Sequence, residues 1–174
     1  MEEEPKGGRV LEVRIAGLSV DATTSQPVLL LVPVGERAES ANTRRALPIW
    51  IGTPEATAIL LAIQNVVPPR PMTHDLMLGA IQATGFQVDR IEVTRLDGGT
   101  FYASLVLRNE AQVAVVDARP SDCVALAVRS GCPIFVADEV FSEAAVEVTE
   151  VDEEAEVERF RDFLEHVDPA DFMS

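Results

Sequence analysis

The fold can be predicted outward from Arg70-Pro71-Met72-Thr73-His74-Asp75-Leu76, whose pattern recurs in Arg119-Pro120-Ser121-Asp122-Cys123-Val124. Each stretch has an Arg-Pro pair, then a hydroxyl residue and an aspartate, and then an apolar run closed by a glycine. This order is typical of a helix start, where the hydroxyl caps free amides and the aspartate lies at the positive end of the dipole. We therefore expect Thr73 and Ser121 to cap two helices that end about three turns later.

The rest of the chain supplies mainly strands. A further helix is expected from the cap-like Thr53 to Ile63, with Pro54 at its first position. Alternating or continuous apolar runs and turn residues predict strands at Val10–Val20, Val28–Val32, Ala46–Ile51, Phe86–Leu96, Thr100–Arg108, Gln112–Asp117 and Pro133–Val136. Asp97-Gly98-Gly99 predicts a hairpin turn, and Pro48 places its strand at an edge or bulge. Because hairpins dominate and helices are clustered, the fold class is α+β, with a mostly antiparallel twisted sheet.

Charge divides the 174 residues into segments. The net charge is −15, and the segment from Asp138 to Ser174 contributes 14 acidic residues against two basic ones. Residues 5–137 are neutral, with 12 of each sign. We expect a flexible acidic N-terminus at 1–9, one domain at 10–140 and an acidic C-terminal segment at 141–174 with an amphipathic helix at Glu153–Val167.

Composition limits location and chemistry. There is no apolar run long enough to cross a membrane, the N-terminus does not resemble a signal peptide, and Cys123 and Cys132 form no C-x-x-C pair. A cytoplasmic protein without membrane partners is expected. The motifs that bind nucleotides, catalytic zinc or a serine nucleophile are absent, so no organic cofactor is expected.

His74 and Asp75 are the first candidate site residues. Asp75 is a candidate metal ligand or general base, and His74 a candidate proton donor or phosphate contact. The alternative is structural: Asp75 compensates the helix dipole and His74 is an ordinary surface histidine. Trp50 is expected in the core or at a subunit interface.

The second candidate site surrounds Arg119. Asp117 ends the preceding strand and Asp122 lies at the helix start, so oxygen ligands from both could hold Mg²⁺ or another divalent cation. Such an ion would suit phosphodiester hydrolysis. In the alternative, Arg119 forms a salt bridge that locks the turn and Ser121 is a plain cap.

Five motifs in order resemble the bifunctional nuclease family, a small DNase/RNase domain of bacteria and plants: Leu47–Gly52, Arg70–Leu76, Thr100–Ala103, Asp117–Asp122 and Pro133–Val136. The resemblance spans about Val10 to Val140 and reaches the tail at Phe160–Phe172. Met72 and Cys123 stand where leucine and alanine are usual. The resemblance implies an α+β fold, a homo-oligomer and hydrolysis of DNA and RNA.

The resulting hypothesis is a metal-assisted nuclease of low specificity. His74, Asp75 and Asp122 would be catalytic, and Asp75, Asp117 and Asp122 would hold the metal. The substrate phosphate would be bound by Arg70, Arg119, Thr73 and Ser121. The alternative hypothesis is a non-enzymatic homo-oligomeric binding module in which both Arg-Pro motifs are helix caps and the acidic tail recruits a partner.

Overall fold

The computed structural model describes residues 8–35, 43–149 and 162. The elements run β1 (Val10–Val20), β2 (Pro27–Pro33), β3 (Thr43–Trp50), α1 (Thr53–Ile63), α2 (Thr73–Ala83), β4 (Gln87–Asp97), β5 (Thr100–Arg108), β6 (Val113–Ala118), α3 (Pro120–Ser130), β7 (Ile134–Ala137), α4 (Asp138–Ala144) and β8 (Val146–Thr149). Every strand and helix expected up to residue 137 is present. The predicted helix at Glu153–Val167 lies outside the described residues except for Asp162, which is helical and exposed.

The strands form one eight-stranded sheet in the order β6-β5-β4-β7-β1-β2-β3-β8. All neighbours are antiparallel except β4 and β7. This confirms the α+β class and the mostly antiparallel sheet. The sheet also continues beyond residue 140, because β8 pairs with the first half of β3.

Pro48 lies where its strand has only one neighbour. It pairs with Leu30 of β2, while the ladder between β3 and β8 ends at Ala46. Proline has no N–H to donate to a strand on the outer side, and no strand of the described residues lies there. The position therefore agrees with the predicted edge position.

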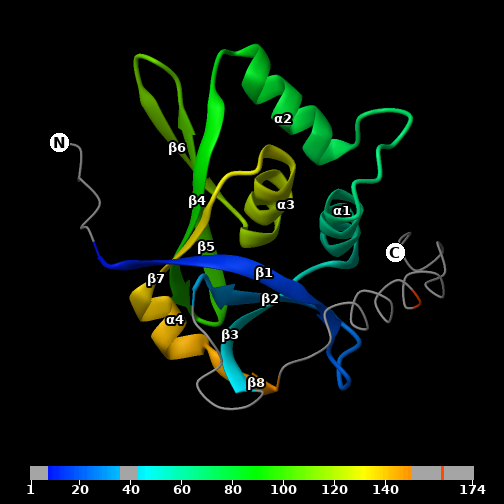
Figure 1. Ribbon diagram of the computed structural model, residues 1–174, viewed down its shortest axis with the longest axis vertical. Coiled ribbons are helices and arrows are strands. Elements are labelled where there is room, and N and C mark those ends of the chain that lie inside the picture. Colours follow the sequence, from blue (N-terminus) through cyan, green and yellow to red (C-terminus); the bar gives the residue numbers. More distant parts are fainter. Residues whose placement is uncertain (1–7, 36–42, 150–161, 163–174) are drawn as a thin grey trace.

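Helix α3 is the centre of the core. Its residues from Cys123 to Ala127 are at most 2% exposed, because α3 packs against β4 and β5 on one side and against α1 and α2 on the other. Figure 1 shows these three helices gathered beside the sheet, with α4 apart from them next to β7. Gly131 ends α3 in the left-handed conformation at φ 73°, as expected of a helix-terminating glycine.

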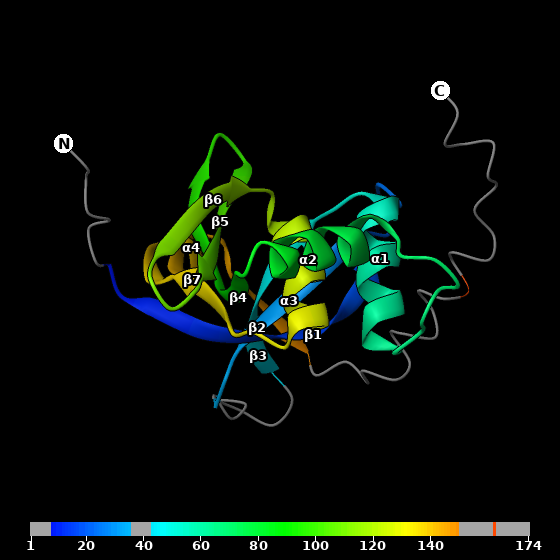
Figure 2. The same ribbon diagram turned by 90° about the horizontal axis from the view of Figure 1, so that it is seen from above.

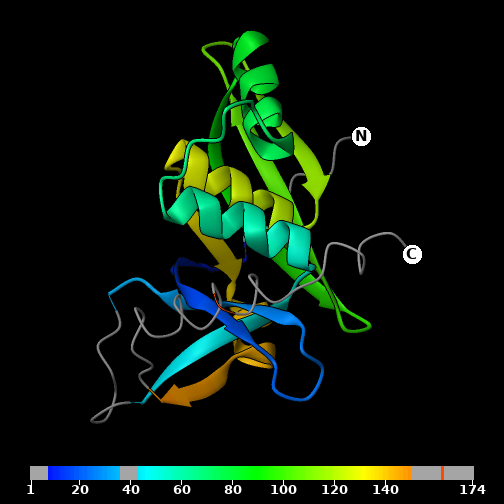
Figure 3. The ribbon, with the colours of Figure 1, turned by 90° about the vertical axis from the view of Figure 1, so that its right-hand side faces the viewer.

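Helices α1 and α3 lie side by side, and α2 rises from them at a steep angle (Figures 2 and 3). Helix α2 has His74 as its sole buried residue. Leu76 is 66% exposed, and Met77 and Ala80 are exposed with it, so these three apolar side chains of α2 face outward. Among the described residues, no helix has the length and apolar character needed to span a membrane.

Candidate functional site

The first Arg-Pro motif starts α2 one residue earlier than predicted. Leu76 N donates to the carbonyl of Met72, which makes Met72 the N-cap and Thr73 the first helical residue. The backbone amide of Met72 donates instead to Asp75 Oδ2 at 2.9 Å. The prediction that Thr73 caps this helix is therefore wrong, because the carboxylate one turn later takes that role.

The second motif starts α3 in the same way. Arg119 is the N-cap, Pro120 is the first helical residue, and Cys123 N donates to the Arg119 carbonyl. No side chain caps this helix, so the prediction for Ser121 is also wrong; Ser121 is buried within the first turn. Thr53 is also not the cap of its helix, because the N-cap of α1 is Gly52 and no side chain caps it.

His74 of the first motif contacts Asp122 of the second. The distance from His74 Nε2 to Asp122 Oδ1 is 3.0 Å, and the two side chains are 9% and 23% exposed. A carboxylate accepts hydrogen bonds, so this contact requires a proton on Nε2. In the neutral ring, Nδ1 then carries the lone pair.

Arg119 joins this pair to α1. Its Nε donates to Asp122 Oδ2 at 2.7 Å and its Nη2 donates to Asp122 Oδ1 at 3.1 Å, a bidentate contact. The same Nη2 lies 3.0 Å from Glu55 Oε1. We call Glu55, His74, Arg119 and Asp122 the helix-start cluster. It connects the first turns of three helices.

The electrostatics of the cluster keep Asp122 ionised. Burial raises the pKa of Asp122, but the hydrogen bonds from Arg119 and His74 outweigh it, and the pKa lies below its ordinary value. The hydrogen bond to Asp122 in turn raises the pKa of Arg119. Arg119 remains 65% exposed on its side chain, so one cation of the cluster faces solvent.

Asp75 belongs to a separate ion pair. Its Oδ1 accepts from Arg129 Nε at 2.7 Å, and the Arg129 side chain is 10% exposed. The hydrogen bond from Arg129, with that from the Met72 amide, lowers the pKa of Asp75. His74 and Asp75 are adjacent in sequence but face different parts of α3, as neighbours in a helix must.

The other predicted site residues do not join the helix-start cluster. Arg70 and Thr73 are exposed and Asp117 is exposed on β6, and among the described residues none of their side chains forms a hydrogen bond or ion pair with His74, Arg119 or Asp122. Within residues 8–35, 43–149 and 162, no three or more His, Cys, Asp or Glu side chains are placed to hold a metal. The predicted metal ligands Asp75, Asp117 and Asp122 thus form no shared set within one chain.

Two members of these contacts were not predicted as site residues. Glu55 was visible only as a first-turn acid of α1, and Arg129 only as a basic residue near the end of α3. Both positions match the helix dipole, so the sequence carried no signal for the longer-range pairing.

Trp50 does not lie in the core. It is 51% exposed at the end of β3, and its Nε1 donates to Asp21 Oδ2 at 3.0 Å. The expectation of a core position is wrong, because the side chain at this strand end lies beside the polar turn after β1. The interface alternative stays a prediction.

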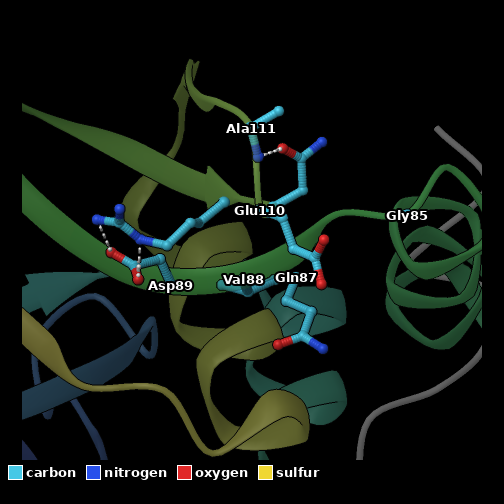
Figure 4. Close-up of a pocket in the computed structure, with 8 residues that line it drawn as sticks. Gly85, Gln87, Val88, Asp89, Glu110 and Ala111 are labelled. Atoms are coloured by element: carbon cyan, nitrogen blue, oxygen red, sulfur yellow. Dashed lines mark hydrogen bonds and ion pairs between the residues drawn. The ribbon is translucent and has the colours of Figure 1, made fainter.

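A hollow of about 770 Å³ lies away from the helix-start cluster, between the start of β4 and the turn from β5 to β6 (Figure 4). Asp89 lines it and accepts from Arg108 Nε at 2.8 Å and from Arg90 Nη1 at 2.7 Å. No predicted site residue lines this hollow.

Comparison of the sequence with protein-family models gives a match that contains both Arg-Pro motifs. The family model described as the bifunctional nuclease domain matches residues 38–149. The chain belongs to the bifunctional nuclease domain family. The match runs from the segment before β3 to the end of β8 and contains the whole helix-start cluster.

Relatives within this similarity fall into two groups. An uncharacterized protein of Mycobacterium tuberculosis is 45% identical over 171 residues, covering 94% of this chain and 98% of the relative. Bifunctional nuclease 1 of Oryza sativa subsp. japonica is 28% identical over 93 residues, covering 52% of this chain and 28% of the relative. Bifunctional nuclease 1 of Arabidopsis thaliana is 29% identical over 98 residues, covering 55% and 30% respectively. The bifunctional nuclease domain is therefore one part of these longer plant proteins.

Proposed function

We propose that this chain hydrolyses phosphodiester bonds of DNA and RNA at the helix-start cluster. The observation that carries the proposal is the contact between the two Arg-Pro motifs, in which His74 of α2 bonds Asp122 of α3. Membership of the bifunctional nuclease domain family and the names of the plant relatives support the reaction class.

Arg119 is the phosphate-binding group in this proposal. Its guanidinium is the most exposed part of the cluster and presents donors in the fork geometry that suits phosphate oxygens. Glu55 and Asp122 hold it in place from two helices. Arg70, Thr73 and Ser121 stay predicted phosphate contacts.

His74 carries the proton and Asp122 orients it. With Nε2–H bound to Asp122, Nδ1 can take a proton from a water whose oxygen attacks phosphorus. The bond from phosphorus to the leaving sugar oxygen breaks, and that oxygen receives the proton from His74. The negative charge of Asp122 stabilises the imidazolium between these two transfers.

A divalent cation stays a separate prediction. The set proposed from sequence does not fit one metal within one chain, so no step above goes through a metal. One or two carboxylates together with the phosphate oxygens of a substrate commonly suffice to bind Mg²⁺. Cleavage in the presence of a chelator therefore measures whether the reaction requires a divalent cation.

The second candidate function is a non-enzymatic homo-oligomeric module. The same contacts favour it in one respect, because the helix-start cluster joins the first turns of α1, α2 and α3 and leaves His74 only 9% exposed. Homo-oligomer formation stays a prediction. Strand β6 at one edge of the sheet exposes Val113, Val115 and Val116, which is the kind of edge that another chain can cover.

The experiment is cleavage of single-stranded DNA and RNA by the purified chain and by Arg119→Gln, each with and without chelator. Loss of one preorganised cation at a phosphate should reduce cleavage by about 10²- to 10³-fold. Arg108→Gln is the matched control, since Arg108 is another exposed arginine paired with an aspartate, and it should cleave like the parent. Equal cleavage by the parent and Arg119→Gln would overturn the role of Arg119 as the phosphate-binding group. No cleavage by the parent at all would favour the non-enzymatic module.

A further inference from the structure

A second hollow, of about 470 Å³, adjoins the start of α2. Its apolar walls come from the connection between α1 and α2 and from the facing surfaces of α2 and α3: Val66, Val67, Pro68, Leu78 and Val128. Val67 is 88% exposed and Val66 is 48% exposed, so this wall presents apolar surface to solvent. The volume lies within the range of small-molecule sites, and the apolar lining suits the faces of a flat ring.

One ion pair supplies the polar groups of this hollow. Arg129 and Asp75 both line it, and the Arg129 side chain is nine-tenths buried. Arg129 Nε donates to Asp75, and Nη1 donates to the Ala125 carbonyl at 2.9 Å. In the described part of the chain, Arg129 Nη2 has no acceptor, which leaves it free to donate to a ligand.

Asp75 has acceptor capacity left as well. Each of its carboxylate oxygens accepts one hydrogen bond, from Arg129 and from the Met72 amide, and each can accept a second. The hydrogen bond from Arg129 keeps the pKa of Asp75 low, so the group is ionised at neutral pH and acts only as an acceptor. The hollow therefore offers a donor beside two acceptors.

We propose that this hollow binds a guanine base. The Watson–Crick edge of guanine presents an oxygen acceptor followed by two N–H donors, which matches a free Arg129 amino group followed by the two Asp75 oxygens. Adenine, cytosine and uracil each place at least one acceptor against the carboxylate or a donor against the guanidinium. Such a mismatch leaves polar groups of the ligand or of the partly buried ion pair unpaired, which disfavours the other three bases.

The inference rests on the proposed function and narrows its specificity. Asp75 follows His74 directly in sequence but faces a different part of α3, so the hollow would bind a base of the substrate strand apart from the proposed proton carrier. The predicted low specificity would then apply to the sugar, ribose or deoxyribose, and not to the base. A substrate strand that carries a guanine for this hollow would be preferred.

Gly79 provides a way to close the hollow. It lines the hollow from α2, and a Cβ added there would meet nothing within 4 Å. Gly79→Phe should place a ring in the space for the base while removing a residue unfavourable in a helix interior. Ala80→Phe is the matched control, because Ala80 is exposed on the same helix and does not line the hollow.

The test is titration of the full chain with guanosine, adenosine, cytidine and uridine by calorimetry. Free nucleosides have no phosphate, so their binding is independent of Arg119. Guanosine should bind at least about tenfold more tightly than the other three. Gly79→Phe should weaken guanosine binding at least about tenfold, and Ala80→Phe should leave it unchanged, with the circular dichroism of both variants like the parent's.

Equal affinity for all four nucleosides, absence of guanosine binding, or full binding by Gly79→Phe would overturn the inference. Cleavage measured on the same preparations separates it from the proposed function. If the chain cleaves nucleic acid but shows no guanosine preference, the base site alone is refuted. If guanosine binds as expected but Arg119→Gln cleaves like the parent, the catalytic proposal alone is refuted.

Discussion

The two Arg-Pro motifs have nearly the same sequence pattern but start helices in opposite environments. In α3 the residues from Cys123 to Ala127 are buried, whereas α2 buries only His74. Strand β6 leads directly into α3 and places it against the sheet, while a connection of nine residues carries the chain from α1 to α2. A helix-start pattern thus determines where a helix begins but not how deeply it packs.

The aspartates of the two motifs show the same divergence. Asp122 bonds Arg119 of its own motif and His74 of the other, whereas Asp75 bonds Arg129 from the last turn of α3. Arg119 contacts Glu55 across to α1, and Arg70 makes no corresponding ion pair among the described residues. The second motif therefore supplies most of the helix-start cluster, and the first contributes His74.

The largest difference should appear in stability. Leu126→Ala in α3 should lower the free energy of unfolding by about 2–5 kcal/mol, because Leu126 is 1% exposed and its removal leaves a cavity. Leu76→Ala in α2 should change it by less than about 0.5 kcal/mol, because Leu76 is 66% exposed. Urea unfolding of both variants measures this. Equal losses would mean that α2 packs against something in solution.

A smaller difference should appear in how the free energy of unfolding depends on pH below neutrality. The pKa values of Asp75 and Asp122 are lowered in the folded chain, so the folded state binds fewer protons than the unfolded state. Their contribution to the free energy of unfolding is complete above about pH 4, the pKa of an aspartate in the unfolded chain. This contribution is lost as the pH falls from there through the lower pKa values of the folded chain. Asp75→Asn and Asp122→Asn should each flatten the acid side of the stability curve, by less than about 2 kcal/mol.

Unfolding midpoints between pH 3 and pH 7 measure this effect. The parent should lose stability more steeply below pH 4 than either variant. If all three curves run parallel, the ion pairs seen in the structure do not persist in solution.

Sequence predicted the elements well because periodicity and turn residues are local signals. The hairpin at Asp97-Gly98-Gly99 and the helix closed by Gly131 are confirmed. Helix α4 and strand β8 were missed because both elements are short and acidic, and the strand depends on pairing with β3. The caps at Thr73 and Ser121 were wrong because each helix begins one or two residues earlier than the hydroxyl suggested.

Three members of the helix-start cluster were predicted as site residues, but their pairings were not. His74, Arg119 and Asp122 were chosen from their motifs, and the structure brings all three together. Glu55 and Arg129 were not chosen, since each enters through a contact between distant segments. Contacts between distant segments also explain why the prediction grouped Asp75 and Asp117 with Asp122. In the structure Asp75 pairs with Arg129, and Asp117 is exposed on β6.

A double-mutant cycle on cleavage by His74→Gln and Asp122→Asn tests the central claim most directly. If Asp122 acts through His74, each single variant should lose about 10²- to 10⁴-fold in rate, and the double variant should lose little more than the worse single one. Unfolding midpoints on the same preparations show that the variants are folded. Cleavage by either single variant at the parent's rate, or a double variant whose loss is the product of the two, would contradict the account.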